Sequence, residues 1–376
     1  MKIKRWSVTL TQLMYIIVIC IAVLRSMQFQ VSPGDNMDLQ RHFYMIDQIK
    51  QSEYSLVEYV FFNGDIFTSN ISLKFAYTFN IIMYLVAKYC NNYYIVAWLF
   101  VFIDYCIITY IGNDWWKSQG GRKGLMWLFE LMLCFSLLPF FQAVSGLRTA
   151  LAACLMALAI YLFLYKRKIW IRCIIPMLIS STVHPVFIMA IPFMVLAKYF
   201  RRKTGILISV IACTSIPTFA ALFIRSSNHF LYSIAFKYIQ YTGKDGYRST
   251  RFCYYGVIVI GILTLTLYLY SVYLNSKSGL FKEKKENFEN KIYNFIVYFF
   301  IFILSNIGGY EMVLRPAYLL GAMAPIVTGL VFNVHKEIRK KDGVVILIQT
   351  MLFFILMYVS IMYLRWHSEY YVVGWN

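Results

Sequence analysis

The sequence has few charged residues, and this shortage excludes an ordinary soluble domain. Charged residues make up 14% of the 376-residue chain and apolar residues 60%, whereas soluble domains have roughly 25% and 45–50%. The mean hydropathy is +0.61, and the apolar residues form long blocks rather than the alternating pattern of a membrane barrel. Because backbone groups in hydrocarbon must be satisfied within a segment, we expect an all-α, polytopic transmembrane helical bundle.

The familiar motifs of phosphate, nucleophile and metal chemistry are also missing. The chain has no GxxxxGK[ST], GxSxG or HExxH motif and no EF-hand loop. None of its eight cysteines forms a CxxC pair or a Cys/His cluster with zinc-site spacing. We therefore expect no metal and no cofactor. Charges within the apolar blocks are few, chiefly Asp104 and Glu130, and ion-driven transporters usually need more.

Acidic residues are scarce beside basic ones, 17 against 36, which gives a net charge of +19. Most basic residues flank apolar blocks, where they set membrane topology. We therefore expect contacts with membrane lipids and no nucleic-acid partner. By the positive-inside rule the basic clusters are cytoplasmic, and they fall at residues 2–5, 117–123, 166–168, 201–203, 277–291 and 336–341.

The apolar blocks, taken with these clusters, predict about eleven spans in a single integral membrane domain, residues 1–376. The blocks cover residues 8–25, 74–89, 93–112, 124–145, 147–165, 169–182, 185–200, 205–225, 255–275, 292–308, 316–334 and 343–364. The N-terminus and the 117–123 cluster are both expected in the cytoplasm, so an even number of spans separates them. Block 74–89 is therefore predicted to be a re-entrant or interfacial helix on the outer side. The N-terminus is then cytoplasmic and the C-terminus outside, with outer loops 26–92 and 226–254 and a cytoplasmic loop 276–291.

One section is too short for two ordinary spans. The chain must leave and re-enter the cytoplasm between the clusters at 166–168 and 201–203. Blocks 169–182 and 185–200 are each shorter than the roughly 20 residues of a full span. We predict a short helical hairpin or re-entrant pair that turns at residues 182–185, with His184 at its outer apex.

The first outer loop contains Asp38, Arg41 and His42, spaced i, i+3 and i+4. A helix would place them on one face. A carboxylate beside a histidine and an arginine can do acid–base work or hold a phosphate. The alternative is a solvated loop with a local ion pair.

Several arginines are expected at the outer face. Arg148 starts a block that is otherwise apolar; an arginine near hydrocarbon normally faces a cavity or an anionic partner, and a helix N-terminus attracts phosphate. The alternative for Arg148 is snorkelling to the interface. Arg315, before Pro316, stands at another outer helix start. Arg248 and Arg251 lie in a tyrosine-rich loop that suits either an anionic headgroup with sugar rings or an aromatic belt.

These residues resemble the EpsG/Wzy-type family of bacterial polysaccharide polymerases. Residues 145–152, SGLRTALA, are similar to the family's small-Gly-apolar-Arg-Gln-x-x-Ala element, which an apolar helix, a basic turn and a segment ending in histidine follow. Residues 38–43, DLQRHF, resemble its Asp-x-x-Arg-Tyr-Tyr pattern. The order agrees over residues 30–200, and Arg315 matches a late outer arginine. Thr149, His42 and Val186 depart from the pattern and leave the subfamily and sugar specificity open.

The resemblance implies a multi-pass membrane glycosyltransferase of the bacterial cytoplasmic (inner) membrane. Its substrate would be an undecaprenyl-diphosphate-linked oligosaccharide, and its product an O-antigen, capsule or exopolysaccharide. Such a transfer needs cations for the leaving diphosphate and a base for the acceptor hydroxyl. We assign Arg148, Arg315 and Arg248 to the diphosphate, Asp38 or His184 as the base, and Arg41, His42 and Arg251 to substrate binding.

Two other functions stay open, as does a chain-length regulator as a partner protein. A flippase for lipid-linked oligosaccharides would need polar residues along a path through the membrane. Another polyprenyl-phosphate-dependent glycosyltransferase would use similar residues. The clustering of the candidates in one outer layer favours the polymerase.

Overall fold

The computed structural model describes part of the chain, and within that part every regular element is a helix. The described residues are 10–29, 38–62, 75–118, 143–144, 146–166, 170–228, 231–232, 235–236, 238–239, 288–306, 310–323 and 326. This confirms the all-α class for these ranges. The chain divides into two compact units, and neither is continuous in sequence. The first comprises Met1–Glu53, Met83–Leu151 and Met323–Asn376, and the second Tyr54–Ile82 and Ala152–Ala322.

Among the described residues, three helices are long and apolar enough to cross a membrane. They are Ile95–Trp115, Leu147–Tyr165 and Arg202–Phe223, and each coincides with a predicted block. They identify the chain as a membrane protein. The count of eleven spans and the orientation of the termini stay predictions.

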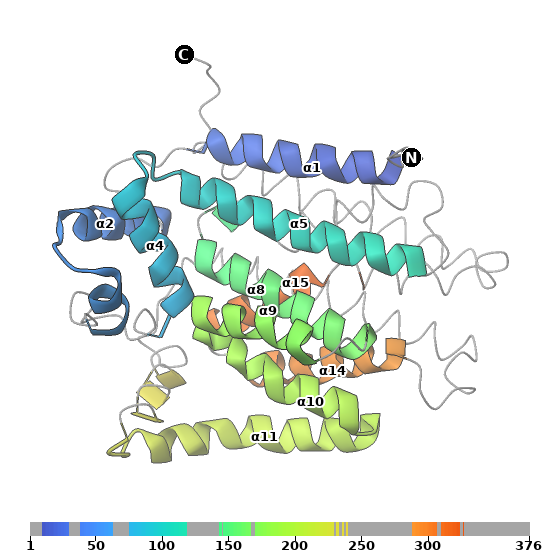
Figure 1. Ribbon diagram of the computed structural model, residues 1–376. Coiled ribbons are helices and arrows are strands. Elements are labelled where there is room, and N and C mark those ends of the chain that lie inside the picture. The colour runs from blue at the N-terminus through green and yellow to red at the C-terminus, as the bar shows by residue number, and fades with distance from the viewer. Residues whose placement is uncertain are drawn as a thin grey trace. The chain divides into compact units, whose positions relative to one another are not determined.

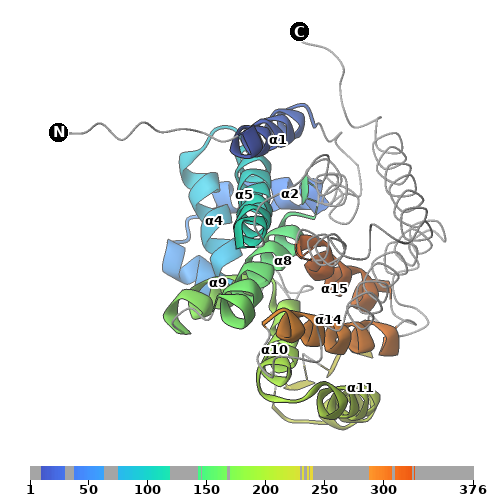
Figure 2. The ribbon, with the colours of Figure 1, turned by 90° about the vertical axis from the view of Figure 1, so that its right-hand side faces the viewer.

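Helices α1 (Leu10–Met27) and α5 (Ile95–Ser118) form the main packed pair of the first unit. They run side by side in opposite directions (Figures 1 and 2). Ala22 and Ser26 of α1 are fully buried, as are Ala97 and Val101 of α5. Small side chains let membrane helices approach closely, which matters where lipid removes the hydrophobic drive for association.

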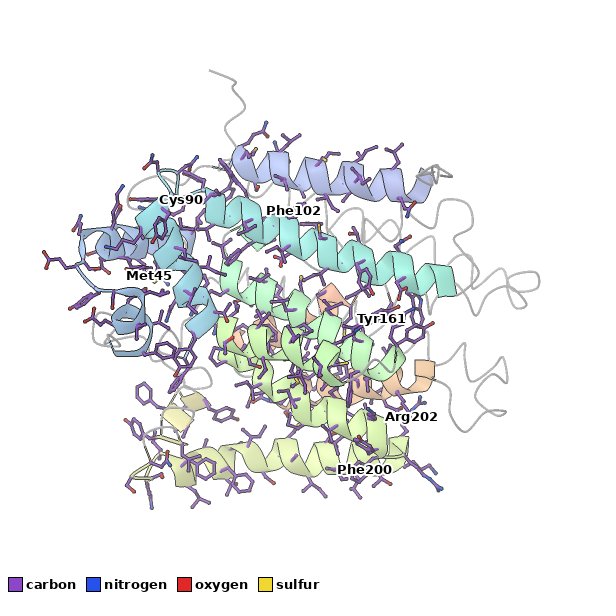
Figure 3. The ribbon with its side chains drawn as sticks, viewed as in Figure 1. Met45, Cys90, Phe102, Tyr161, Phe200 and Arg202 are labelled. Carbon is purple, nitrogen blue, oxygen red and sulfur yellow. The ribbon has the colours of Figure 1, made fainter. Side chains whose placement is uncertain are left out.

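The same unit holds α2 (Asp38–Gln51), an amphipathic helix of the predicted outer loop. Its buried residues are Leu39, His42, Met45, Ile46 and Ile49, and Met45 is labelled in Figure 3. Their spacing of three and four residues is that of one helix face.

The following helix, α4 (Tyr77–Tyr89), has 13 residues, about 20 Å at the α-helical rise. It is too short for an untilted span, which fits the predicted interfacial helix.

Helix α8 (Leu147–Ile160) continues directly into η2, a π-helical turn at Tyr161–Tyr165. Ala152, Ala153, Ala157 and Ala159 of α8 are fully buried, so small residues again line the contact surface. In η2, the rings of Tyr161 and Tyr165 stack with centroids 5.3 Å apart.

The second unit is organised around α14 (Phe288–Ser305), which packs against α10, α11, α15 and η2 (Figure 2). These partners are α10 (Ala190–Tyr199), α11 (Arg202–Phe223) and α15 (Tyr310–Ala322). The Phe193 ring of α10 meets Phe299 edge-on at 5.7 Å. Aromatic pairs of this geometry stabilise by about 0.5–1.5 kcal/mol beyond the area they bury.

Helix α11 is held against α14 at its first turn. Arg202 donates from Nε to the side-chain Oδ1 of Asn294 at 2.9 Å, and Arg202 stands at the start of α11 in Figure 3. The Tyr298 hydroxyl donates to the Arg201 and Arg202 carbonyls, each at 3.4 Å. A Cβ at Gly205 would overlap the Tyr298 phenol, so only glycine allows this approach.

The two predicted short segments and the turn between them are confirmed, whereas the outer position of the turn stays a prediction. Helix α9 (Trp170–Val183) is followed by His184 and the 3₁₀-helix η3 (Pro185–Met189), which leads into α10. With 14 residues, α9 is about 21 Å long, against a hydrocarbon core of about 30 Å. The two arms have different partners, because α9 packs on η3 and η2 whereas α10 packs mainly on α14.

One predicted boundary was wrong. The block at 316–334 predicted a helix start beside Arg315, but α15 begins at Tyr310, so both Arg315 and Pro316 lie inside the helix. Proline is tolerated within membrane helices because neighbouring groups can satisfy the carbonyl that it leaves unbonded.

Candidate functional site

His184 lies at the apex of the hairpin with its side chain buried, 2% exposed. Its backbone is extended, with φ −144° and ψ 104°, as expected for a residue before proline. Its N–H donates to the Ser180 carbonyl at 2.9 Å, which closes the last turn of α9. The Phe187 ring stands edge-on to the imidazole, 79° from its plane. The chain therefore fixes His184 on both sides of the turn.

Arg315 of α15 contacts the imidazole of His184. Its Nη1 lies 3.1 Å from Nε2 of the histidine. An arginine has only N–H donors, so Nε2 must be the acceptor in this bond. The Val186 N–H faces the other ring nitrogen, Nδ1, at a longer 3.4 Å. Two residues singled out from the sequence thus form one hydrogen-bonded pair.

Two hydroxyls fix the last turn of α9, just before His184. The Ser180 hydroxyl donates to the Ala152 carbonyl of α8 at 2.7 Å. The Thr182 hydroxyl donates to the Leu178 carbonyl at 2.8 Å and lies 2.7 Å from the Thr78 hydroxyl of α4. Since Thr182 uses its proton on the carbonyl, Thr78 donates to Thr182. Sequence reasoning did not identify these two anchors.

The other predicted residues, Asp38, Arg41, His42 and Arg148, belong to the first unit. Asp38 and Arg41 are exposed and form an ion pair at 3.4 Å on the first turn of α2. An exposed pair of this kind contributes about 0–1 kcal/mol. The predicted helix is confirmed at these residues. The local ion pair, which was the alternative interpretation of Asp38 and Arg41, is also present.

His42 faces the interior of the unit instead of solvent, with 8% of its surface exposed. Burial, and after it the positive charges of Arg148 and Arg41, lower the pKa of His42 from the ordinary 6.5 to about 3. The imidazole is therefore neutral at physiological pH. His42 lies on the same buried face of α2 as Leu39, Ile46 and Ile49. The apolar periodicity of α2 could therefore have indicated that His42 is buried.

Arg148 is the second residue of α8, at the helix N-terminus that the sequence predicted. Its side chain is half-buried, and its Nη1 is buried completely. Its positive charge acts on His42. The first unit therefore brings a buried cation and a neutral imidazole together beneath the exposed Asp38–Arg41 pair.

Tyr93, which sequence reasoning did not single out, lies against α2 in the same unit. Its hydroxyl donates to Oδ1 of Asp47 at 2.7 Å, and this bond raises the pKa of Tyr93. Its ring lies 6.1 Å from that of Phe43 and has the Lys50 ammonium 5.8 Å from its centroid. The contacts join residues far apart in the chain, so local spacing carried no signal for them.

The remaining predicted ligands, Arg248 and Arg251, lie outside the described residues, with most of the loop 226–254. In the part of the chain that is described, no three His, Cys, Asp or Glu side chains gather as a metal site. The described candidate residues form two groups, one in each compact unit. One is His184 with Arg315, and the other is Arg41, His42 and Arg148.

Comparison with known proteins gives one match. The family model described as EpsG family matches residues 11–371, nearly the whole chain. No curated protein and no solved structure matches it.

Proposed function

Because the chain belongs to the EpsG family, we propose that it is a polysaccharide polymerase of the bacterial cytoplasmic membrane. Family membership indicates a role in polysaccharide biosynthesis, and the apolar helices indicate a membrane protein. The proposed substrate is an oligosaccharide repeat unit linked to undecaprenyl diphosphate, used on the outer face of the membrane. The hydrogen bond between Arg315 and His184 is the observation that carries the proposal.

The proposed reaction exchanges one bond at an anomeric carbon for another. The bond from the growing glycan to the lipid diphosphate breaks, and a bond to a sugar hydroxyl of the next repeat unit forms. The diphosphate leaves with the bonding electrons, and the acceptor hydroxyl gives up its proton. A cation that meets the developing negative charge and a base that takes the proton therefore speed the transfer.

The Arg315–His184 pair suits both needs. Arg315 supplies donors that fit a phosphate, and Nε2 of His184 has the lone pair that a base requires. We propose that Arg315 turns to the diphosphate when the substrate binds. Nε2 then accepts the proton of the acceptor hydroxyl. The buried position of His184 favours this role, since a water-poor site strengthens the interactions that stabilise a transition state.

Asp38 is the less suitable base because its carboxylate is exposed and paired with Arg41. We propose that Asp38 instead orients Arg41. Arg148, Arg41 and His42 are proposed to bind an anionic part of the lipid-linked substrate, with the two arginines supplying the positive charge and neutral His42 one N–H donor. Arg248 and Arg251 remain proposed substrate ligands, and a chain-length regulator remains a proposed partner.

Glycan analysis in a deletion strain tests the function. We expect the strain to display single repeat units at its surface, with long chains restored by the wild-type gene but not by His184→Gln. Loss of the units from the outer face would contradict the proposal and favour a flippase. A repeat unit lacking one sugar would favour another polyprenyl-phosphate-dependent glycosyltransferase.

A further inference from the structure

Tyr93 packs against one side of helix α2. Phe43, Asp47 and Lys50 occupy positions i, i+4 and i+7 of this helix and therefore share a side. Tyr93 reaches all three, through its hydroxyl to Asp47 and its ring to Phe43 and Lys50. Phe43, Asp47, Lys50 and Tyr93 together form the Tyr93 patch.

The patch combines hydrogen-bonding groups with apolar ring surface. Asp47 is exposed, and a carboxylate has about four lone-pair positions, of which the Tyr93 hydroxyl uses one. Lys50 is exposed too, and an ammonium offers three donors. Tyr94 extends the rings, since it meets Phe43 edge-on at 4.7 Å. Acceptor, donor and aromatic surface therefore lie within one helix turn of each other.

The charges of the patch select against phosphate. The opposite charges of Asp47 and Lys50 cancel. The two other candidate groups, one with Arg315 and one with Arg41 and Arg148, are cationic. A neutral pyranose fits the patch better, because it carries hydroxyls that bond to charged groups and C–H surfaces that lie against rings. Hydrogen bonds to charged groups are the stronger kind, so the Asp47 carboxylate is the expected main contact.

The position of the patch also suits a sugar on a lipid carrier. Tyr93 lies two residues before the span-length helix Ile95–Trp115, which puts it at the expected edge of the apolar layer. An ordinary interfacial tyrosine turns its hydroxyl to headgroups and water. The Tyr93 hydroxyl is instead committed to Asp47, which holds ring and carboxylate in fixed relative positions.

We propose that the Tyr93 patch is a carbohydrate subsite that binds one neutral sugar ring of the lipid-linked glycan. The identity of that glycan rests on the proposed function, whereas sugar binding itself is testable without it. The subsite contributes positioning and affinity, with Asp47 receiving hydroxyl protons and Tyr93 covering one side of the ring.

Binding of a lipid-free oligosaccharide to the purified full-length protein tests this subsite. The probe is the repeat-unit oligosaccharide released by mild acid from the cell's own lipid-linked intermediates, which removes lipid and diphosphate. We expect Tyr93→Ala and Asp47→Asn to weaken binding about tenfold, the effect of losing one hydrogen bond to a charged group. Tyr93→Phe keeps the ring and loses the bond to Asp47, so its loss should be smaller than that of Tyr93→Ala.

Tyr89→Ala is the matched control, because Tyr89 is a tyrosine of the same unit that is 79% exposed. It should bind the oligosaccharide like the wild type. An equal loss in Tyr89→Ala would overturn the subsite in favour of a general aromatic belt. Wild-type affinity in Asp47→Asn and both Tyr93 variants, or no binding by the wild type, would also overturn it. Competition by inorganic diphosphate would overturn the choice of a neutral sugar.

Polymer formation by the same preparations separates the two proposals. If the variants lose oligosaccharide binding while the wild-type protein forms no polymer, the subsite stands and the proposed function fails. If the wild type polymerises and the patch variants bind normally, only the subsite fails.

Discussion

His184 and Arg315 are 131 positions apart in the chain and joined by a hydrogen bond of 3.1 Å. One stands in the turn between two short helices, and the other lies inside a helix that packs on α14. The turn fixes the imidazole, and the guanidinium determines which ring nitrogen accepts. The pair therefore combines a proton acceptor with a cation that suits phosphate, in one unit of the molecule.

Removal of either partner should slow polymer formation strongly. Arg315→Gln removes the cation, and His184→Gln removes the acceptor nitrogen. By analogy with loss of a transition-state donor, we expect each to lower the rate about 10²–10³-fold. The double variant should be little worse than either single one, because the two residues act as a unit.

Arg225→Gln is the control for this pair. Arg225 is an arginine of the same unit, at the end of α11, and its loss should leave the rate near that of the wild type. The rate of chain elongation in membranes measures all four variants. Additive losses in the double variant would mean that the residues act independently.

Thr182 should act as a positioning residue for His184. Thr182→Val keeps the shape and loses the bond to Thr78. A hydrogen bond contributes about 0.5–1.5 kcal/mol, so we expect a rate loss of about two- to tenfold. Thr182→Ser keeps the hydroxyl and should restore most of the rate.

Combining Thr182→Val with His184→Gln distinguishes a positioning role of Thr182 from a general loss of stability. In the His184→Gln background, Thr182→Val should have no further effect on the elongation rate, because the residue it positions is gone. A similar fold-change in both backgrounds would show that Thr182 acts elsewhere. Ser180→Ala, which removes the bond to Ala152, should follow the same pattern.

The two short helices that meet at His184 were predictable from charge, because two basic clusters expected on the same side of the membrane leave room for only two short segments between them. The helical character of α2 and the helix start at Arg148 were predictable from local spacing and the apolar block. The contact of Tyr93 with Asp47 was not, since a tertiary contact between residues 46 positions apart leaves no local pattern. The start of α15 was missed because polar residues at a helix end do not register as an apolar block.

Neutral His42 should make stability depend on pH. Its pKa is about 3 in the folded protein against an ordinary 6.5, so below pH 6.5 the unfolded chain binds a proton that the folded protein does not. Stability should therefore fall as the pH drops from 6.5 toward 3, by up to about 1.4 kcal/mol per pH unit. The Tm of detergent-solubilised protein between pH 7 and 5 measures this effect.

His42→Gln cannot titrate and should show a shallower fall of Tm with pH. Arg41→Gln removes the guanidinium that has the smaller effect on the pKa of His42, so it should change the slope less. An identical slope in wild type and His42→Gln would mean that His42 binds protons equally in the folded and the unfolded protein, and would contradict its lowered pKa.

Gly205→Ala should destabilise the contact of α11 with α14. The added Cβ meets the Tyr298 phenol, whose hydroxyl is bonded to the start of α11. Overpacking of this kind costs about 1–3 kcal/mol, so the Tm should fall. Adding Tyr298→Leu, which shortens the opposing side chain, should recover part of the loss. No change in Tm for Gly205→Ala would show that the two helices separate readily.

Reconstitution shows directly whether the protein joins lipid-linked repeat units. The purified protein in liposomes is given undecaprenyl-diphosphate-linked repeat units, and the products are sized by mass spectrometry. We expect glycans of two or more units with release of undecaprenyl diphosphate, and no such product from His184→Gln or Arg315→Gln. Single units that only cross the bilayer, or equal product from the wild type and both variants, would contradict it.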